Sequence, residues 1–400
     1  MATLTCLRTI RIPERPSLIW VELETDDGLV GLGETFRGAS AVEAVLHDEI
    51  APWLLGRDAE HIERISRHLL SPYVGFNSSG AEVRAASAID IALWDLSGKR
   101  QGVPLHVALG GSMRDSVPTY NTCAGYAYNT TGTRRDITLH DQAAGPYDDQ
   151  VAFMRDAGAL AQSLLDEGYK AMKIWPFDIY APQSNGQTIS LTDLKAGLEP
   201  FRKIRQAVGD RIEVMAELHS LWGSHAALRI CRALEDYGVF WAEDPLSKMD
   251  DVQALADLRR QTRTPICGSE TLGGLRPFRD LLAHDALDVV MLDLAWCGGL
   301  TEGRKIAALA QAYAKPLAPH DCTGPVVLMA GLHMALHAPT AIYQEVVRAS
   351  LATWYPDLVT GLPIIEQGMA RAPDAPGLGT ALKPAVREQV GAIVRERRLA

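Results

Sequence analysis

Six ionisable side chains recur in the second half of the chain, each near the end of a short apolar run that precedes a helix-like segment. They are Glu217, Glu243, Glu270, Asp293, His320 and Glu345, and the gaps between them are 26, 27, 23, 27 and 25 residues. A strand, a helix and two short loops need about that length, so the spacing predicts consecutive βα units. In a parallel barrel the carboxyl ends of the strands share one rim, where catalytic residues lie. We therefore expect these six side chains to converge.

Glu217, Glu243 and Glu270 are the predicted metal ligands. Three buried carboxylates with no cation among them are too costly to desolvate unless they bind a metal. An all-oxygen set without a cysteine or histidine ligand favours a hard cation, and one Mg²⁺ per subunit is the first choice. The alternative is that these are surface glutamates at loop starts. That is a common fate for one glutamate, but it explains three in matched spacing poorly.

A histidine and an aspartate end two neighbouring predicted strands. A carboxylate beside an imidazole fixes the ring tautomer and raises its basicity, so His320, paired with Asp293, is the candidate general base. A structural hydrogen bond between the two in the core is the alternative. His219 follows Glu217 by two residues, so strand alternation would place both side chains on one face. His219 is the candidate general acid, or else a solvated loop histidine.

Lys173 and Glu345 complete the candidate site. Lys173 lies in a predicted strand, with Trp175 on the same face. Beside a divalent ion, a lysine can have its pKa lowered enough to transfer protons, or can neutralise a substrate anion. A surface lysine with its ammonium group in solvent is the alternative. Glu345 is a candidate hydrogen-bond partner for a substrate or intermediate oxygen, and a role outside the site is equally open.

The element predicted to position these residues is a barrel at residues 116–348. Residues 117–122 read as its first strand and residues 169–175 as its second. Two long polar connections, 124–149 and 176–190, interrupt the first units, and connections of this length are often lids or insertions. The six βα units whose strands end in the ionisable residues from Glu217 to Glu345 then complete the barrel.

An α+β module is predicted for residues 1–115. Three antiparallel strands, at 2–12, 17–24 and 29–34, come before segments with helical periodicity. The residues after 348 are irregular and end in a charged tail. We expect this last segment, 349–400, to pack back against the first module.

The composition limits the classes of function. A hydrophobic content of 47% with 22% charged residues is ordinary for a soluble globular protein. The net charge of −10 argues against a nucleic-acid partner. No apolar run approaches the roughly 18 residues that would span a membrane, and the N-terminus has no signal-peptide pattern. The six cysteines lack CxxC spacing, so reduced thiols in a cytoplasm are expected.

The chain resembles the enolase superfamily, in particular its mandelate racemase subgroup, over nearly its whole length. The blocks GLVGLGE, SAIDIALWDLSGK, AWCGGLTEGRKIAALA and APHD, with the three glutamates, carry the resemblance. It implies an α/β fold in which a modified TIM barrel, (β/α)7β, carries an N-terminal α+β capping domain completed by the C-terminal segment. It further implies Mg²⁺-assisted removal of the proton α to a carboxylate, and a homo-oligomer. Specificity would lie in capping loops, here near residues 35–37 and 73–77.

Two departures from the subgroup favour one reaction. Its Lys-x-Lys pair reads Lys173-Ile174-Trp175 here, and Trp175 cannot accept a proton, so one of the two opposed bases needed for racemisation is absent. Glu217-Leu218-His219 resembles the Asp-x-His of galactonate- and mannonate-type sugar-acid dehydratases, whose histidine acts as the acid. Dehydration of an aldonate or aldarate to a 2-keto-3-deoxy acid is therefore expected. His320 would take the α-proton and His219 would protonate the departing hydroxyl.

Two other functions stay open at the level of sequence. A racemase, epimerase or cycloisomerase on the same scaffold would use Lys173 as the second base, and solvent deuterium would then enter the substrate without loss of water. A non-catalytic barrel would keep metal binding but would exchange no α-proton. In each of the enzymatic readings the partner is a small-molecule carboxylate.

Overall fold

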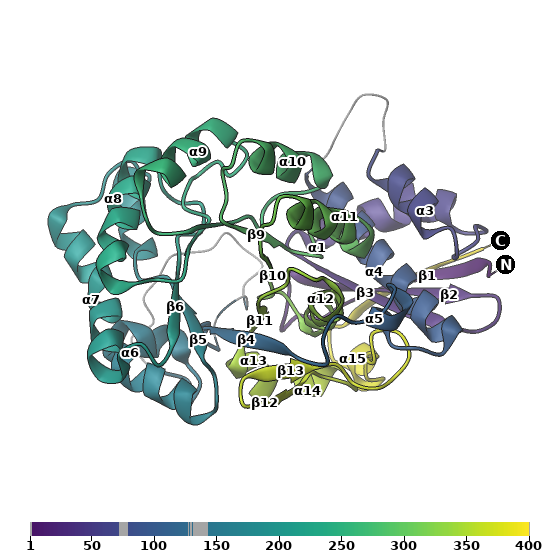
Figure 1. Ribbon diagram of the computed structural model, residues 1–400. Coiled ribbons are helices and arrows are strands. Elements are labelled where there is room, and N and C mark those ends of the chain that lie inside the picture. The colour runs from purple at the N-terminus through teal and green to yellow at the C-terminus, as the bar shows by residue number, and fades with distance from the viewer. Residues whose placement is uncertain (1, 72–78, 127, 129, 131–142, 400) are drawn as a thin grey trace.

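The computed structural model describes residues 2–71, 79–126, 128, 130 and 143–399. They form a barrel surrounded by helices, with a smaller α+β layer, the cap, packed against one side (Figure 1). The predicted capping loop at 73–77 and much of the predicted connection at 124–149 lie outside the described residues. None of the helices in the described part combines the length and apolar character needed to cross a bilayer.

The cap is a four-stranded antiparallel sheet covered by helices. The sheet order is β14-β1-β2-β3, formed by β1 (Leu4–Arg11), β2 (Leu18–Thr25), β3 (Val30–Phe36) and β14 (Ile393–Arg398). The cap helices are α1 (Ala39–Ala44), η1 (Val45–Ile50), α2 (Ala51–Leu54), α3 (Ile62–Leu69), α4 (Ala81–Gln101) and α5 (Leu105–Ala108). Helix α4 lies directly on β3, where a Cβ on Gly33 would overlap the carbonyl oxygen of Ala88. Gly31 and Gly33 of GLVGLGE therefore permit this close approach.

Eight parallel strands of the described chain close into the barrel. They are β4 (Val117–Thr122), β5 (Ala171–Ile174), β6 (Glu213–Glu217), β7 (Ala242–Glu243), β8 (Ile266–Gly268), β9 (Val289–Leu292), β10 (Leu317–Pro319) and β11 (Gln344–Val346). Consecutive strands pair from β4 to β10, and β11 pairs with β4. A bridge between Leu317 and Ala341 completes the circle. The predicted strands 117–122 and 169–175 correspond to β4 and β5.

Seven helices connect these strands on the outside. They are α6 (Asp149–Asp166), α7 (Leu191–Val208), α8 (Ser224–Leu234), α9 (Val252–Gln261), α10 (Leu275–Ala283), α11 (Gly299–Ala312) and α12 (Pro325–His337). Most bury one face, as α7 does with Leu194, Phe201 and Ile204. Helix α12 is buried on all sides from Pro325 to Leu336, because it lies between the barrel and the cap. One helix per connection gives the predicted (β/α)7β order, so the predicted fold class is confirmed.

The remaining elements tie the end of the chain to both parts. Short helices and strands follow the barrel: α13 (Arg348–Ala352), α14 (Tyr355–Leu358), β12 (Ile364–Glu366), β13 (Met369–Arg371) and α15 (Ala385–Glu388). Strand β13 pairs antiparallel with β4, and β14 then pairs antiparallel with β1, so the two termini lie side by side (Figure 1). The domain boundaries at 115/116 and 348/349 stay a prediction.

The barrel interior explains why the strand ends converge. The inward side chains form a separate buried cluster of Tyr120, Ala171, Met215, Trp241, Cys267, Val289, Met291 and Ala318. Strand side chains alternate with a period of two, so the next inward position lies one layer nearer the rim. For β5, β6 and β7 that position is Lys173, Glu217 and Glu243. The apolar cluster is therefore the floor on which the candidate site rests.

Candidate active site and metal centre

The three predicted ligands come together at the rim. Glu217 ends β6, Glu243 ends β7 and Glu270 follows the end of β8 by two residues. All three are buried, and one carboxylate oxygen from each lies within 4.8 Å of the other two. Trp241 Nε1 donates to Glu243 Oε2 at 2.9 Å and so holds this side chain from the floor. Three converging hard oxygen donors fit a divalent cation such as Mg²⁺.

Lys173 lies among these carboxylates. Its Nζ forms an ion pair with Glu243 Oε1, and it lies 3.0 Å from Glu345 Oε1 and 3.3 Å from Glu217 Oε2. The expectation that no cation lies among the glutamates is therefore wrong, because β5 neighbours β6 and brings its inward lysine to the same level. Burial opposes the ammonium charge, but Glu243 and Glu345 outweigh it and hold the pKa of Lys173 well above its usual value. Lys173 is a cation in this arrangement.

His320 faces the cluster from the opposite strands. Its Nδ1 lies 2.6 Å from Asp293 Oδ2, and its Nε2 lies 2.8 Å from Glu270 Oε2. The other Asp293 oxygen accepts from Ala295 N at 2.6 Å, which fixes the carboxylate. Burial disfavours the imidazolium, but Glu270 and then Glu345 outweigh it and raise the pKa of His320. The predicted pair thus exists, and Nε2 is aimed at the predicted metal ligands.

His219 also lies at this site, but in the turn after β6 and not within the strand. Strand β6 ends at Glu217, and His219 and Ser220 follow with positive φ angles of 50° and 54°. The predicted reason for a shared face, a continuing strand, is therefore wrong. The turn nevertheless directs His219 N to Glu217 Oε1 at 2.6 Å. The ring Nδ1 lies 2.7 Å from Asp178 Oδ2.

Asp178 is a site residue that the sequence reading missed. It is buried and begins the 3₁₀ helix η2 (Asp178–Ser184), inside a segment read only as a long polar connection. With His219 it forms a second imidazole–carboxylate pair, matching that of His320 and Asp293. The motif Trp175-Pro-Phe-Asp directly after β5 could have identified Asp178 as a site residue, because a carboxylate just after a barrel strand lies near the rim. Trp175 itself packs edge-on against His219, with ring centres 5.5 Å apart.

Glu345 in β11 connects the two sides of the centre. Its Oε1 faces Lys173, while its Oε2 accepts from Asp321 N at 2.9 Å and lies 3.9 Å from His320 Nε2. The structure therefore brings all eight predicted site residues to one rim: Lys173, Glu217, His219, Glu243, Glu270, Asp293, His320 and Glu345.

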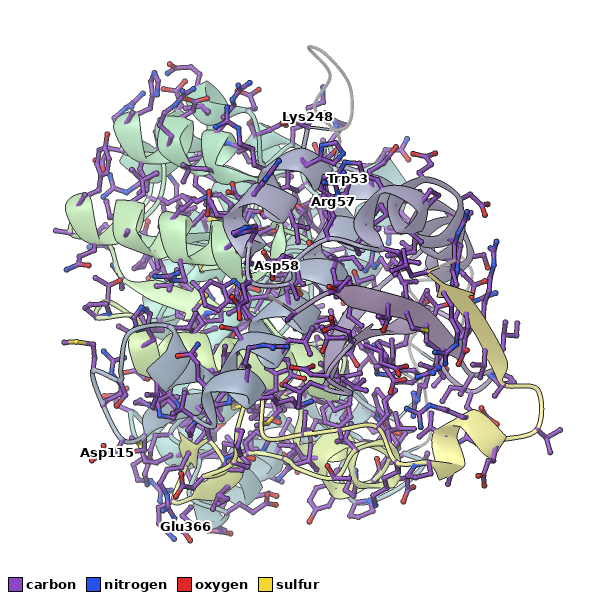
Figure 2. The ribbon with its side chains drawn as sticks, turned by 90° about the vertical axis from the view of Figure 1, so that its right-hand side faces the viewer. Trp53, Arg57, Asp58, Asp115, Lys248 and Glu366 are labelled. Atoms are coloured by element: carbon purple, nitrogen blue, oxygen red, sulfur yellow. The ribbon has the colours of Figure 1, made fainter. Side chains whose placement is uncertain are left out.

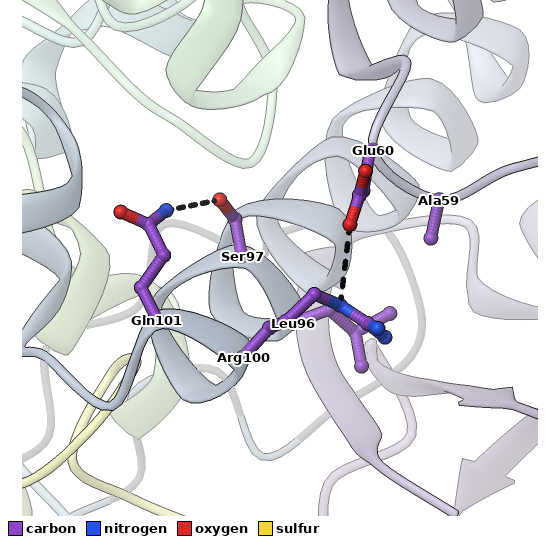
Figure 3. Close-up of a pocket in the computed structure, with 6 residues that line it drawn as sticks. All are labelled: Ala59, Glu60, Leu96, Ser97, Arg100 and Gln101. Carbon is purple, nitrogen blue, oxygen red and sulfur yellow. Dashed lines mark hydrogen bonds and ion pairs between the residues drawn. The ribbon is translucent and has the colours of Figure 1, made fainter. Parts of the chain in front are cut away.

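A separate hollow lies on the cap (Figure 3). Its walls are Ala59, Glu60, Leu96, Ser97, Arg100 and Gln101. The polar groups there are paired with one another, since Arg100 Nε lies 3.9 Å from Glu60 Oε1 and Gln101 Nε2 donates to Ser97 Oγ at 3.0 Å. None of the predicted site residues lines this hollow, so it takes no part in the chemistry described above.

Two family models match the chain. "Mandelate racemase / muconate lactonizing enzyme, N-terminal domain" matches residues 9–110, and "Enolase C-terminal domain-like" matches residues 156–386. Among curated relatives, the D-xylonate dehydratase of Haloferax volcanii is 31% identical over 388 residues, covering 95% of this chain and 87% of that protein. The D-galactonate dehydratase of Ralstonia nicotianae is 31% identical over 397 residues, covering 96% and 93%.

Solved structures match both the cap and the barrel. An enolase protein from environmental genome sequencing of the Sargasso Sea is 64% identical, with a TM-score of 0.90 and complete coverage of both chains. An enolase of the mandelate racemase subgroup from Agrobacterium tumefaciens is 46% identical, with a TM-score of 0.88 and 99% of both chains covered.

Proposed function

The chain belongs to the mandelate racemase/muconate lactonizing enzyme family of the enolase superfamily, and from that premise we propose that it is a carbon–oxygen lyase that dehydrates a sugar acid to a 2-keto-3-deoxy acid. The observation that carries the proposal is the presence of two imidazole–carboxylate pairs at one acidic cluster, His320 with Asp293 and His219 with Asp178. Elimination of water needs a base and an acid, and these pairs supply one of each. Relatives named as sugar-acid dehydratases support the same reaction class.

Glu217, Glu243 and Glu270 would hold Mg²⁺. When bound, the ion would supply positive charge that stabilises the negative charge developing on the substrate carboxylate as the α-proton leaves. Lys173 adds a second, permanent positive charge from the adjoining strand. Because these groups are buried and already oriented, their charges cost little reorganisation during the reaction.

The proton transfers follow from the two pairs. With Glu270 bound to the ion, the imidazole of His320 would be neutral, so Nε2 would accept the proton from C2 while Asp293 at Nδ1 holds the ring and stabilises the imidazolium that forms. The electrons of the C2–H bond form the C2–C3 double bond as the C3–O bond breaks. His219 would protonate the departing hydroxyl, so that one water leaves. The enol then gains a proton at C3 and loses one from its C2 hydroxyl, which gives the 2-keto-3-deoxy acid.

A racemase or epimerase would need a second base opposite His320. The indole of Trp175 has no proton-accepting nitrogen, and its ring packs against His219 and Phe153. The ammonium group of Lys173 is engaged by three carboxylates. These contacts favour dehydration over racemisation.

A library of aldonic and aldaric acids, incubated with the enzyme and Mg²⁺ and assayed for 2-keto-3-deoxy products, tests this proposal. We expect turnover of at least one acid, and loss of that turnover with EDTA or in Glu243→Gln. An absence of products from every acid, together with exchange of the α-hydrogen in both configurations of one of them, would establish a racemase instead.

A further inference from the structure

Two guanidinium groups from the cap lie beside the His320 side of the centre. Arg37 follows β3, and Arg84 is in the first turn of α4. The Cζ atoms of Arg84 and Arg37 lie 5.1 and 5.7 Å from the centre of the Trp296 ring. The Trp296 ring is stacked on His320, with ring centres 5.6 Å apart. Both positive charges therefore lie close to the indole ring that packs on the proposed base.

Neither arginine forms an ion pair with a carboxylate of the described residues. Other cap arginines, such as Arg8 and Arg100, are paired with carboxylates. Burial and the neighbouring charge of Arg37 lower the pKa of Arg84, against the charge of Asp293, which raises it. Arg84 is half-buried and Arg37 is exposed. An anion that contacts both guanidinium groups would relieve the repulsion between them.

Hydrogen bonds fix Arg84 and the end of β3 relative to the catalytic pair. The carbonyl oxygen of Phe36 accepts from Arg84 Nη1 at 2.7 Å and from Trp296 Nε1 at 3.1 Å. Thr35 Oγ1 donates to the carbonyl oxygen of Ala295 at 2.9 Å. The end of β3 is thus fastened to the loop that follows β9, directly after Asp293. A ligand held by the arginines would have a fixed position relative to His320.

We propose that Arg37 and Arg84 form an anion subsite for the far carboxylate of the substrate, so that the substrate class is the sugar diacids (aldarates) rather than the aldonates. The inference rests on the proposed function, because His320 and the metal ligands would fix the near carboxylate and the α-carbon. A guanidinium can bind a carboxylate through two parallel hydrogen bonds. An aldonate ends in a neutral hydroxymethyl group, which would leave both positive charges without a counter-ion.

A pair of substrates that differ in one group tests the subsite: a hexarate and the hexonate of the same configuration at C2 to C5. With Mg²⁺, we expect kcat/KM to be at least tenfold higher for the hexarate. The advantage should lie in KM. Because salt screens ionic attraction, the advantage should also shrink as the ionic strength rises. Arg84→Gln and Arg37→Gln should each reduce the hexarate-to-hexonate ratio of kcat/KM at least tenfold.

Arg57 provides a matched control within the cap. Its guanidinium lies 3.8 Å from the centre of the Trp53 ring, and its Nε donates to the Trp53 carbonyl oxygen at 2.7 Å (Figure 2). It thus makes the same kinds of contact as Arg84, an indole ring and a backbone carbonyl, but lines no part of the described site. Arg57→Gln should leave the ratio unchanged.

The outcomes separate the two proposals. Preference for the hexonate, or equal losses on both substrates in Arg84→Gln, would overturn the subsite and leave the dehydratase standing. Faster turnover of a 6-phosphohexonate than of the hexarate would also overturn the diacid assignment, since phosphate would then be the distal anion. If the enzyme dehydrates none of these acids and no other acid in the library, both the proposed function and the subsite are overturned.

Discussion

Lys173 places a positive charge among the acidic side chains of the centre. Its ammonium group contacts carboxylates from three other strands, Glu217, Glu243 and Glu345. A buried charge that loses its partner is strongly destabilising, whereas a paired one is tolerated. Lys173 and a bound cation would therefore share the work of neutralising the same acidic cluster.

Lys173→Met should destabilise the Mg²⁺-free protein by about 3–5 kcal/mol, because it leaves buried carboxylates without a partner. Added Mg²⁺ should recover part of this loss. Lys170→Met is the control, since Lys170 lies just before the same strand but is exposed. Urea unfolding with EDTA and with Mg²⁺ measures both effects, and equal losses for the two variants would contradict the assigned role.

The sequence predicted which residues converge, but it predicted few of the contacts that they make. The recurring acidic strand ends sufficed to identify the glutamates and the pairing of His320 with Asp293. Two features were beyond it. The contact of Lys173 with the glutamates depends on neighbouring strands reaching the same level, and Asp178 lies in a 3₁₀ turn inside a connection with no periodic pattern.

Among the elements, two barrel helices begin against carboxylates that the cap provides. Asp90 in α4 accepts from Thr301 N at 2.9 Å at the start of α11. Glu34 in β3 accepts from Val326 N at 3.2 Å and Val327 N at 3.0 Å at the start of α12. The first N–H groups of a helix have no partner within it and favour a negative charge nearby. The cap thereby fixes the helices that follow the strands of Asp293 and His320.

Glu34 gives this contact a pH dependence. Burial raises the pKa of Glu34 from 4.5 to about 8, against hydrogen bonds from Val327 N and Trp20 Nε1 that lower it. A carboxyl whose folded pKa is raised contributes stability that is present below about pH 4.5 and is lost as the pH rises through about 8. The contribution changes by at most about 1.4 kcal/mol per pH unit.

Glu34→Gln should therefore remove part of the fall in unfolding free energy between pH 5 and pH 8. The measurement is the urea midpoint of both proteins across that range, with exposed Glu60→Gln as the control. Parallel curves for wild type and Glu34→Gln would show that Glu34 does not titrate in this interval.

The elements themselves were largely predictable. Alternating or apolar runs bounded by turn residues predicted β1 to β3 and the barrel strands to within a few residues. The strands after the barrel, β12, β13 and β14, were not predicted, and all six side chains of β14 are exposed. Strand β14 pairs with β1 through the backbone ladder and an ion pair between Arg8 and Glu396. Its sequence, IVRERR, therefore carries no pattern of burial that could reveal a strand.

On the scale of the whole molecule, cap and barrel meet along the rim that carries the site. Helix α4 contacts the start of α11, after β9, where Gly298 N donates to Ser87 Oγ and Trp94 Nε1 donates to Thr301 Oγ1. Strand β3 contacts the loop after β9 through Thr35 and the start of α12, after β10, through Glu34. Both ends of the chain join the cap sheet, through β1 and β14. A ligand at the rim should therefore stabilise both parts together. The homo-oligomer expected from the family resemblance stays a prediction.

Mg²⁺ should raise the unfolding temperature of the whole chain in one transition. A ligand that binds only the folded state adds about 2.7 kcal/mol at a hundred times its dissociation constant. Glu243→Gln should need a higher Mg²⁺ concentration for the same shift, whereas Glu199→Gln, on the surface of α7, should respond as wild type does. Calorimetry at graded Mg²⁺ concentrations measures this, and an identical response of wild type and Glu243→Gln would place the ion elsewhere.

The division of labour between the two histidines is tested most directly by hydrogen exchange in D₂O, with Mg²⁺ and a substrate that the enzyme dehydrates. His219→Asn should lose dehydration by about 10²–10⁴-fold, because the departing hydroxyl has no acid, while recovered substrate still gains deuterium at C2. His320→Asn should show neither reaction. Deuterium at C2 in His320→Asn, or unimpaired loss of water in His219→Asn, would contradict the assignment of base and acid.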